Sequence, residues 1–340
     1  MDSLELIKAL PKAEQHIHIV GSTRPETLLW LIEESDEIHP FESLDEVESF
    51  FQYSDFDHFI SVYSTVSKFI VDENQFERIT YEMLESANLC NVRYVEASFS
   101  APDHVKMGLD YGAMLDAINR GIKRACGVFD VKCNLRIDLV RNYGPDHGMV
   151  VLDWIEEKGD NIIAVDIGGS EQGYPPEPYK SVYNRAKEMG LHLTAHAGET
   201  AGPESIWGVI LHLEVERIGH GTSAVEDPLL MAYLRDTAVT IETCPVSNVR
   251  TNAVSSVREH PIRSFIDNGI NVTVNSDDPS MFSTDMNNEY IQLSKQLRLK
   301  IPELFQLSLN AVDSSFLQSE DKGKLRMKFM KEYRQLKEKL

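Results

Sequence analysis

The chain has 340 residues, of which 26% are charged and 42% are hydrophobic, as is typical of a globular protein. Its formal net charge of −21 argues against nucleic acid as a partner, because phosphate backbones are bound by clustered Lys and Arg. No apolar run approaches the roughly 18 residues of a membrane span, and residues 1–12 lack a signal-peptide pattern. We therefore expect a cytoplasmic protein with no membrane partner. Cys90, Cys126, Cys133 and Cys244 form no CxxC pair, so we expect reduced core residues.

Short runs rich in β-branched residues alternate with longer segments of helical periodicity. The predicted strands are 13–20, 92–99, 131–141, 162–168, 191–196, 216–219, 239–244 and 271–276. Parallel strands need crossover connections, so eight strands with intervening helices predict an α/β fold, a (β/α)8 TIM barrel. An open doubly wound sheet is the alternative, but its glycine-rich first turn is absent from 21–25. We expect residues 1–340 to form a single domain.

A helical insertion is predicted after the first strand, over about 25–91, because this segment is too long for a simple crossover. Within it, Phe56, Phe59, Ile60 and Tyr63 recur at helical spacing. Such a stripe usually packs into a core. In this position it could also act as a lid that covers the mouth of the barrel and contacts a ligand.

Two histidines lie one residue apart in the first predicted strand. Successive side chains of a strand point to opposite faces, so His16 and His18 share one face. This arrangement suits half of a metal site, and it equally suits the polar face of an exposed strand.

Four later strands also end in ionisable residues, and a barrel brings all strand ends to one rim. These residues are His196, Glu199, His220, Glu242, Asp277 and Asp278. His16 and His18, joined by His196 and one of the two aspartates, make a His₃Asp set. Such a set suits zinc, which lowers the pKa of water toward about 7 and supplies hydroxide. Singly, His196 also suits a core histidine, and Asp277-Asp278 suits a helix N-cap.

Several segments together resemble the adenosine deaminase family of metal-dependent amidohydrolases. The matching stretches are Pro11-Lys12-Ala13-Glu14 with His16-Ile17-His18, Val92-Arg93-Tyr94-Val95-Glu96, His196-Ala197-Gly198-Glu199, Arg217-Ile218-Gly219-His220-Gly221, Cys244-Pro245-x-Ser247-Asn248 and Ser276-Asp277-Asp278-Pro279-x-Met281-Phe282. The resemblance implies one zinc ion per chain, held by His16, His18, His196 and Asp277. One metal is expected because the end of the fourth strand, around 166–169, lacks the lysine that bridges two metals in binuclear relatives.

The same resemblance implies a small-molecule purine nucleoside as partner and hydrolytic loss of its 6-amino group as ammonia. Glu199, in its protonated form, would donate to N1, and His220 would take or orient the proton of the attacking water. Asp278 would bond N7, and the backbone N–H of Gly169 would reach N3. The other expected substrate contacts are Val20, Phe56, Phe59, Ile60 and Tyr63. Zinc deaminases of nucleic-acid bases differ, since they carry a Pro-Cys-x-x-Cys signature that this chain lacks.

Val20 departs from the family pattern, since members that act on adenosine or adenine carry an acid there. A valine accepts no hydrogen bond, and losing such a contact costs roughly 1 to 3 kcal/mol. Ser170 and Ser98 similarly stand where an acid and an arginine are common. The Val-Gly-Ser after the histidines, with segments 198–204 and 287–290, resembles the deaminases of 6-aminodeoxyfutalosine in menaquinone synthesis. The resemblance implies an adenosine with an aryl ketone chain at the 5′ end, then adenosine, then adenine.

Other function classes stay open at this point. The sequence is compatible with a monomer or a homodimer, and with a catalytically silent barrel that binds purines. The presence of every predicted ligand and of Glu199 disfavours a silent barrel. Metal-assisted hydrolysis of an amide or phosphate ester is disfavoured because Glu199 and Asp278 would repel a phosphate.

Overall fold

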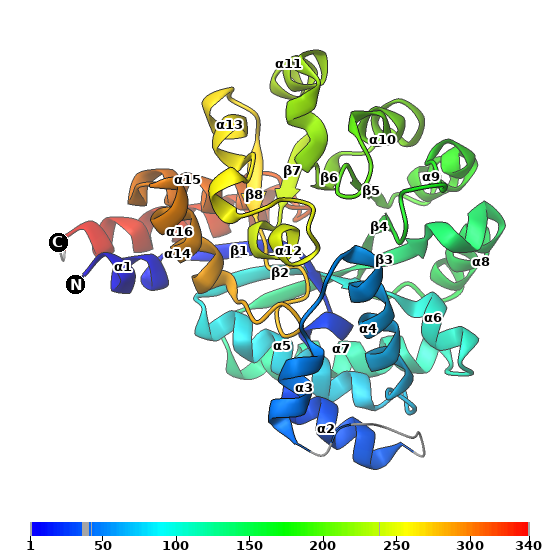
Figure 1. The fold of residues 1–340 in the computed structure, drawn as a ribbon. Helices are drawn as coiled ribbons and strands as arrows, with labels where there is room; N and C mark the ends of the chain where they lie inside the picture. Colours follow the sequence, from blue (N-terminus) through cyan, green and yellow to red (C-terminus); the bar gives the residue numbers. More distant parts are fainter. Residues whose placement is uncertain (1, 36–40, 42, 238, 339–340) are drawn as a thin grey trace.

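Eight parallel strands, arranged in the order of the chain, form a barrel at the centre of the molecule (Figure 1). The computed structural model describes residues 2–35, 41, 43–237 and 239–338. The strands are β1 (Lys12–His18), β2 (Val92–Phe99), β3 (Lys132–Val140), β4 (Ile162–Gly168), β5 (His192–Ala197), β6 (Arg217–His220), β7 (Thr240–Thr243) and β8 (Val272–Val274). The sheet closes through a parallel bridge between Ile17 and Asp277. The predicted (β/α)8 barrel is confirmed.

Helices surround the barrel and join its strands (Figure 1). The α-helices are α1 (Ser3–Ala9), α2 (Pro25–Glu34), α3 (Leu44–Phe50), α4 (Phe56–Lys68), α5 (Gln75–Leu89), α6 (Ala101–Lys106), α7 (Tyr111–Val128), α8 (Gly144–Glu157), α9 (Lys180–Glu188), α10 (Pro203–Gly208), α11 (Pro228–Asp236), α12 (Pro245–Arg250), α13 (Ile262–Asp267), α14 (Met286–Leu297), α15 (Ile301–Asp313) and α16 (Ser319–Lys337). Among the described helices, none combines the length and apolarity needed to cross a bilayer.

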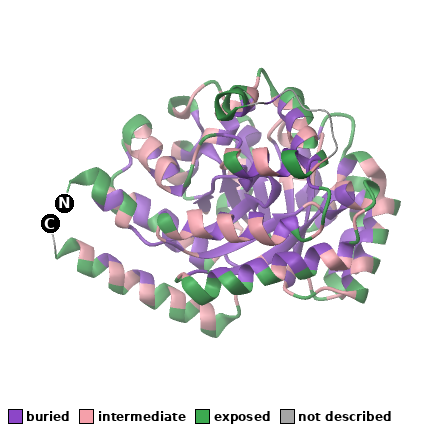
Figure 2. Cartoon of the chain, turned by 90° about the horizontal axis from the view of Figure 1, so that it is seen from below, coloured by how far each residue is buried: buried purple, intermediate pink, exposed green. Residues whose placement is uncertain are grey.

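The core lies between the strands and the inner faces of these helices. Figure 2 shows buried residues throughout the strands and exposed residues on the outward helix faces. Helix α7 illustrates the local rule, because Met114, Ile118, Ile122 and Ala125 repeat at helical spacing and are all buried. The Asp110 side chain begins this helix by accepting a hydrogen bond from the Ala113 N–H at 2.7 Å.

Strand β1 ends two residues earlier than the sequence predicts. Ile19 has helical backbone angles, and Val20–Ser22 form a short 3₁₀ turn, η1. The Ser22 hydroxyl donates to the His18 carbonyl at 2.8 Å and ties the turn to the end of the strand. The prediction that Val20 belongs to the strand is therefore wrong.

The segment between β1 and β2 is helical in its described part. It contains α2, α3, α4 and α5. Of the predicted insertion, 25–91, residues 36–40 and 42 lie outside the described residues. Phe59 of α4 is buried in the core, and Phe56, Ile60 and Tyr63 pack against that core while staying partly exposed.

All four cysteines are unpaired, and Cys90, Cys133 and Cys244 are buried as expected. Cys126 is exposed, so the prediction of a core position is wrong for this residue. Ala125 is on the buried face of α7, and Cys126, the next residue, points to a different side of the helix.

The core face of α7 gives a stability prediction. Ile118 is 0% exposed, so Ile118→Ala should lower the free energy of unfolding by about 2 to 5 kcal/mol through lost burial and the cavity left behind. Val128 is 70% exposed on the same helix, and Val128→Ala should change it by no more than about 0.5 kcal/mol. Urea unfolding curves would measure both, and equal effects would contradict the assigned face.

Candidate active site

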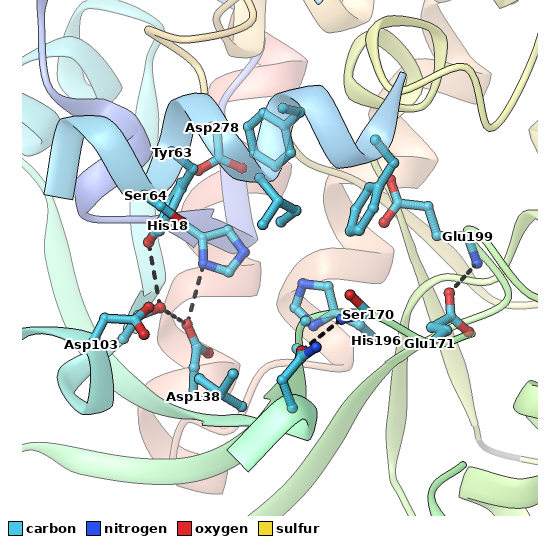
Figure 3. Close-up of a pocket in the computed structure, with 18 of the residues that line it drawn as sticks. His18, Tyr63, Ser64, Asp103, Asp138, Ser170, Glu171, His196, Glu199 and Asp278 are labelled. Carbon is cyan, nitrogen blue, oxygen red and sulfur yellow. Dashed lines mark hydrogen bonds and ion pairs between the residues drawn. The ribbon is translucent and has the colours of Figure 1, made fainter. Parts of the chain in front are cut away.

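A cavity at the carboxyl ends of the strands gathers most of the residues singled out from the sequence (Figure 3). Those that line it are His18, Phe56, Phe59, Ile60, Tyr63, Gly169, His196, Glu199, His220, Asp277 and Asp278. His16 and Val20 are not among the lining residues. His16 is fully buried and lies within 3.4 Å of Asp277, whereas Val20 is buried in η1. The remaining charged lining residues are Asp103, Asp138 and Glu171, so no lysine or arginine lines the cavity among the residues that the structure describes.

Closure of the barrel brings together three side chains that can bind a metal, those of His16, His18 and Asp277. The His18 N–H donates to the Asp277 carbonyl at 2.8 Å, and the Asp277 N–H donates to the His16 carbonyl at 3.1 Å. Asp277 Oδ1 consequently lies 3.4 Å from His16 Nε2 and 3.3 Å from His18 Nε2. These contacts, together with burial, set the pKa of Asp277. Burial acts to raise it, but the two imidazoles hold it well below its ordinary value.

Each of the three histidines has a carboxylate beside its Nδ1 atom. The distances are 3.1 Å from His16 to Glu242, 3.3 Å from His18 to Asp138 and 2.8 Å from His196 to Asp166. The contact between His18 and Asp138 is drawn in Figure 3. A carboxylate on Nδ1 holds that nitrogen as the protonated one and leaves Nε2 with its lone pair.

This arrangement fits a metal ion. One donor atom from each of His16, His18, His196 and Asp277 can be chosen so that all four lie within 4.8 Å of one another. His16 Nε2 is buried and has no hydrogen-bond partner, which is costly unless a ligand occupies that direction. Three imidazole nitrogens and one carboxylate oxygen are a donor set that suits zinc.

Two residues of the site have left-handed backbone conformations. The φ angle is 65° at Asp277 and 64° at His220. Such a conformation costs a residue other than glycine on the order of 1–3 kcal/mol and is concentrated at functional sites. His220 is the last residue of β6 and Asp277 lies three residues beyond the end of β8, and both line the cavity.

Glu199 is held in the cavity by its neighbours. Its N–H donates to Glu171 Oε1 at 2.8 Å, as drawn in Figure 3, and its Oε1 accepts a hydrogen bond from the Thr251 hydroxyl at 3.0 Å. Burial and the nearby charges of Asp277 and Glu171 raise the pKa of Glu199 to about 8. A carboxyl group with this pKa keeps its proton at neutral pH.

His220 faces Glu199 with Nε2 lying 3.5 Å from Glu199 Oε2. Its Nδ1 accepts a hydrogen bond from the Asn248 side-chain amide at 3.0 Å, and this places the proton of the neutral ring on Nε2. Burial lowers the pKa of His220 to about 4, so the imidazole is neutral.

Asp278 lies against Gly21 of η1. A Cβ atom at position 21 would be 1.7 Å from Asp278 Oδ1, so only glycine fits there. Burial and the charge of Asp277 raise the pKa of Asp278 well above its ordinary value. Asp278 Oδ1 is buried against Gly21 without a hydrogen-bond partner, and the residue lines the cavity.

The sequence did not assign a role to the carboxylates beside the histidines. They are Asp138, Asp166 and Glu242, and Glu171 beneath Glu199 was also missed. The available signal was the presence of charged residues within otherwise apolar strands. Arg136 and Asp138 on β3 are two residues apart and therefore point to the same, interior side.

A parallel barrel with three histidines and a carboxylate grouped at its carboxyl rim defines the class of barrel enzymes that can hold a catalytic metal. The adenosine deaminase family model matches residues 11–332, and the chain belongs to this family. It is a hydrolase that acts on C–N bonds.

Similar proteins cover nearly the whole chain. The aminodeoxyfutalosine deaminase of Streptomyces coelicolor is 36% identical over 324 residues, which are 94% of this chain and 83% of that protein. The adenine deaminase of Acinetobacter baylyi is 31% identical over 322 residues, 95% of this chain and 97% of that protein. The crystal structure of adenine deaminase from Arthrobacter aurescens matches with a TM-score of 0.92 and 30% identity, over 95% of this chain and 98% of that one.

The contact between Gly21 and Asp278 gives a prediction. Gly21→Ala should displace the Asp278 carboxyl and lower deaminase turnover by about 100-fold, the effect expected of a 1 Å misplacement. The content of bound metal should stay unchanged, because Asp278 is outside the four-residue donor set. Gly127→Ala is the control, since nothing lies within 4 Å of an added Cβ there. Full turnover in Gly21→Ala, measured by purine absorbance, would contradict the role of this contact.

Proposed function

We propose that the chain catalyses zinc-dependent hydrolysis of the 6-amino group of an adenine nucleoside, most favourably one with a modified 5′ end. The observation that carries this proposal is the position of Glu199. It is buried, its pKa is raised to about 8, and it lies 3.5 Å from His220 in the cavity that also holds the metal-capable residues.

His16, His18, His196 and Asp277 would hold one zinc ion. When bound, the ion supplies an attacking water whose pKa is lowered toward about 7. The reaction adds this water to C6 of the purine and releases the 6-amino group as ammonia. The addition breaks the aromaticity of the ring, so the protein must assist it with a proton donor.

Glu199 supplies that proton in the proposed mechanism. Because its carboxyl group is protonated near neutral pH, it donates to N1 of the purine and removes the electron pair that opposes attack at C6. With Nδ1 accepting the hydrogen bond from Asn248, the neutral ring of His220 has its proton on Nε2, where it can orient the water oxygen and stabilise developing negative charge.

Asp278 and Gly169 orient the base. The raised pKa of Asp278 favours a carboxylic acid, which can donate to N7 of the purine. The backbone N–H of Gly169 would reach N3. Gly169 has a φ of 88°, and an added Cβ would lie 2.6 Å from Asn142 Oδ1, so both its conformation and its surroundings require glycine.

Three observations support a 5′-modified adenosine. The cavity has an aromatic and apolar wall of Phe56, Phe59, Ile60, Tyr63 and Tyr143, which suits an aryl chain. Two of the similar proteins, from Streptomyces coelicolor and Streptomyces avermitilis, are named aminodeoxyfutalosine deaminases. Position 20 is a buried valine, so no acid is present there to accept a hydrogen bond from a 5′-hydroxyl. Adenosine is the next candidate and adenine the third.

The role of Glu199 gives the first test. Glu199→Gln cannot donate a carboxyl proton, so it should lose turnover by at least about 100-fold. Bound zinc, measured by metal analysis, should remain at one ion per chain. Thr251→Val is a control that keeps the Glu199 carboxyl group and removes the Thr251 hydroxyl, which contacts Glu199 Oε1 and the Ser247 carbonyl, so it should keep most of the activity. Full activity in Glu199→Gln would show that another group donates the proton.

Substrate choice gives the second test. We expect turnover to decrease in the order 6-aminodeoxyfutalosine, adenosine, adenine. The loss of purine absorbance would measure the rate with each substrate. A rate with adenosine that equals or exceeds the rate with 6-aminodeoxyfutalosine would overturn the proposed preference.

Turnover of AMP should be slower than turnover of adenosine by at least about 100-fold, because the cavity wall is acidic and like charges brought together cost several kcal/mol.

A further inference from the structure

Arg136 is a fully buried arginine of β3 in the barrel interior. Its Nη1 lies 2.8 Å from Glu242 Oε2 and 3.4 Å from Asp166 Oδ2. These two carboxylates are the ones that face His16 Nδ1 and His196 Nδ1. A single guanidinium therefore contacts the partners of two histidines that come from different strands, β1 and β5.

Asp166 depends on Arg136 more than Glu242 does. Glu242 has a second cation, because Arg217 Nε lies 2.6 Å from its Oε1. In the described part of the chain, Arg136 is the only arginine or lysine within ion-pair distance of Asp166. Without Arg136, Asp166 keeps only neutral hydrogen-bond donors and the imidazole of His196.

Strand β3 also contributes the carboxylate that faces the third histidine, His18. Asp138, which faces His18 Nδ1, is two residues beyond Arg136 and points to the same interior side. The positive charge of Arg136 also acts on Asp138. One short segment of β3 thus contributes to the surroundings of all three histidines.

We propose that Arg136 is a positioning residue for the metal site. It fixes the carboxylates of Asp166 and Glu242, and through them it orients His196 and His16 so that both Nε2 atoms point at one ion. This inference rests on the metal site of the proposed function. A purely structural role is the alternative, since loss of any buried arginine that has ionic partners destabilises a protein.

Zinc affinity separates these two explanations. Arg136→Met keeps an unbranched side chain, although a shorter one, and removes the guanidinium charge. Zinc affinity, measured by competition with a chromogenic chelator, should therefore fall about 10- to 100-fold. Circular dichroism would check that the variant is folded. Arg136→Lys is the second variant, in which one ammonium cannot make both guanidinium contacts, and we expect a smaller loss of affinity.

The neighbouring strand offers a rescue. Ser98 of β2 is the register partner of Arg136, is buried, and accepts a hydrogen bond from Arg136 Nη2 at 3.1 Å. An arginine at position 98 with a serine at position 136 returns the charge to the same part of the interior. The double variant Ser98→Arg with Arg136→Ser should therefore bind zinc at least about tenfold more tightly than Arg136→Ser alone, since the partner carboxylates regain their cation.

A double-mutant cycle identifies the route of the effect. Asp166→Asn keeps the shape of the side chain and removes the charge that Arg136 contacts. If Arg136 acts through Asp166, Arg136→Met should lower zinc affinity less in the Asp166→Asn background than in the wild type. Strictly additive losses, or wild-type zinc affinity in folded Arg136→Met, would overturn the proposal.

These measurements need no substrate. A wild-type chain that binds zinc tightly but turns over no adenine nucleoside would contradict the proposed function and leave the role of Arg136 intact. Normal turnover by the wild type, combined with unchanged zinc affinity in Arg136→Met, would contradict the role of Arg136 alone.

Discussion

The backbone pairing of Asp277 with β1 is the contact on which both the barrel and its site depend. Asp277 accepts a hydrogen bond from the His18 N–H and donates one to the His16 carbonyl. These two bonds close the sheet between its last and first strands. They also set the Asp277 carboxylate beside both imidazoles. Closure of the fold and assembly of the donor set are therefore the same event, and a change that opens one disturbs the other.

The placement of buried arginines distinguishes two pairs of carboxyl groups in the interior. Asp166 and Glu242 face the histidines and have arginine partners, and the pKa of each lies below its ordinary value although burial acts to raise it. Glu199 and Asp278 face the cavity, and in the described residues neither has an arginine or lysine within ion-pair distance. Their pKa values are raised instead. Because an uncompensated buried charge is costly, the same interior contains ionised carboxylates behind the histidines and protonated ones toward a substrate.

The cavity wall carries the remaining chemical information. Its described residues include acidic groups but no lysine or arginine, and one side of it is formed by aromatic side chains of α4 together with Tyr143. Members of this family differ in the purine that they are named for, as the aminodeoxyfutalosine and adenine deaminases among the similar proteins show.

The sequence by itself determined the barrel and the strand ends that carry ionisable residues, because strand periodicity is local and a (β/α)8 fold brings every strand end to one rim. It placed Val20 wrongly, since the helical backbone of Ile19 ends β1 earlier. Only the tertiary structure decided which carboxylate faces which histidine. His16 and Glu242, for example, are 226 positions apart in the sequence. Their strands, β1 and β7, do not pair with each other, so their contact depends on how the whole barrel closes. Only the folded barrel decides that Asp166 and Glu242 meet an arginine, and that Glu199 and Asp278 have no arginine or lysine partner among the described residues.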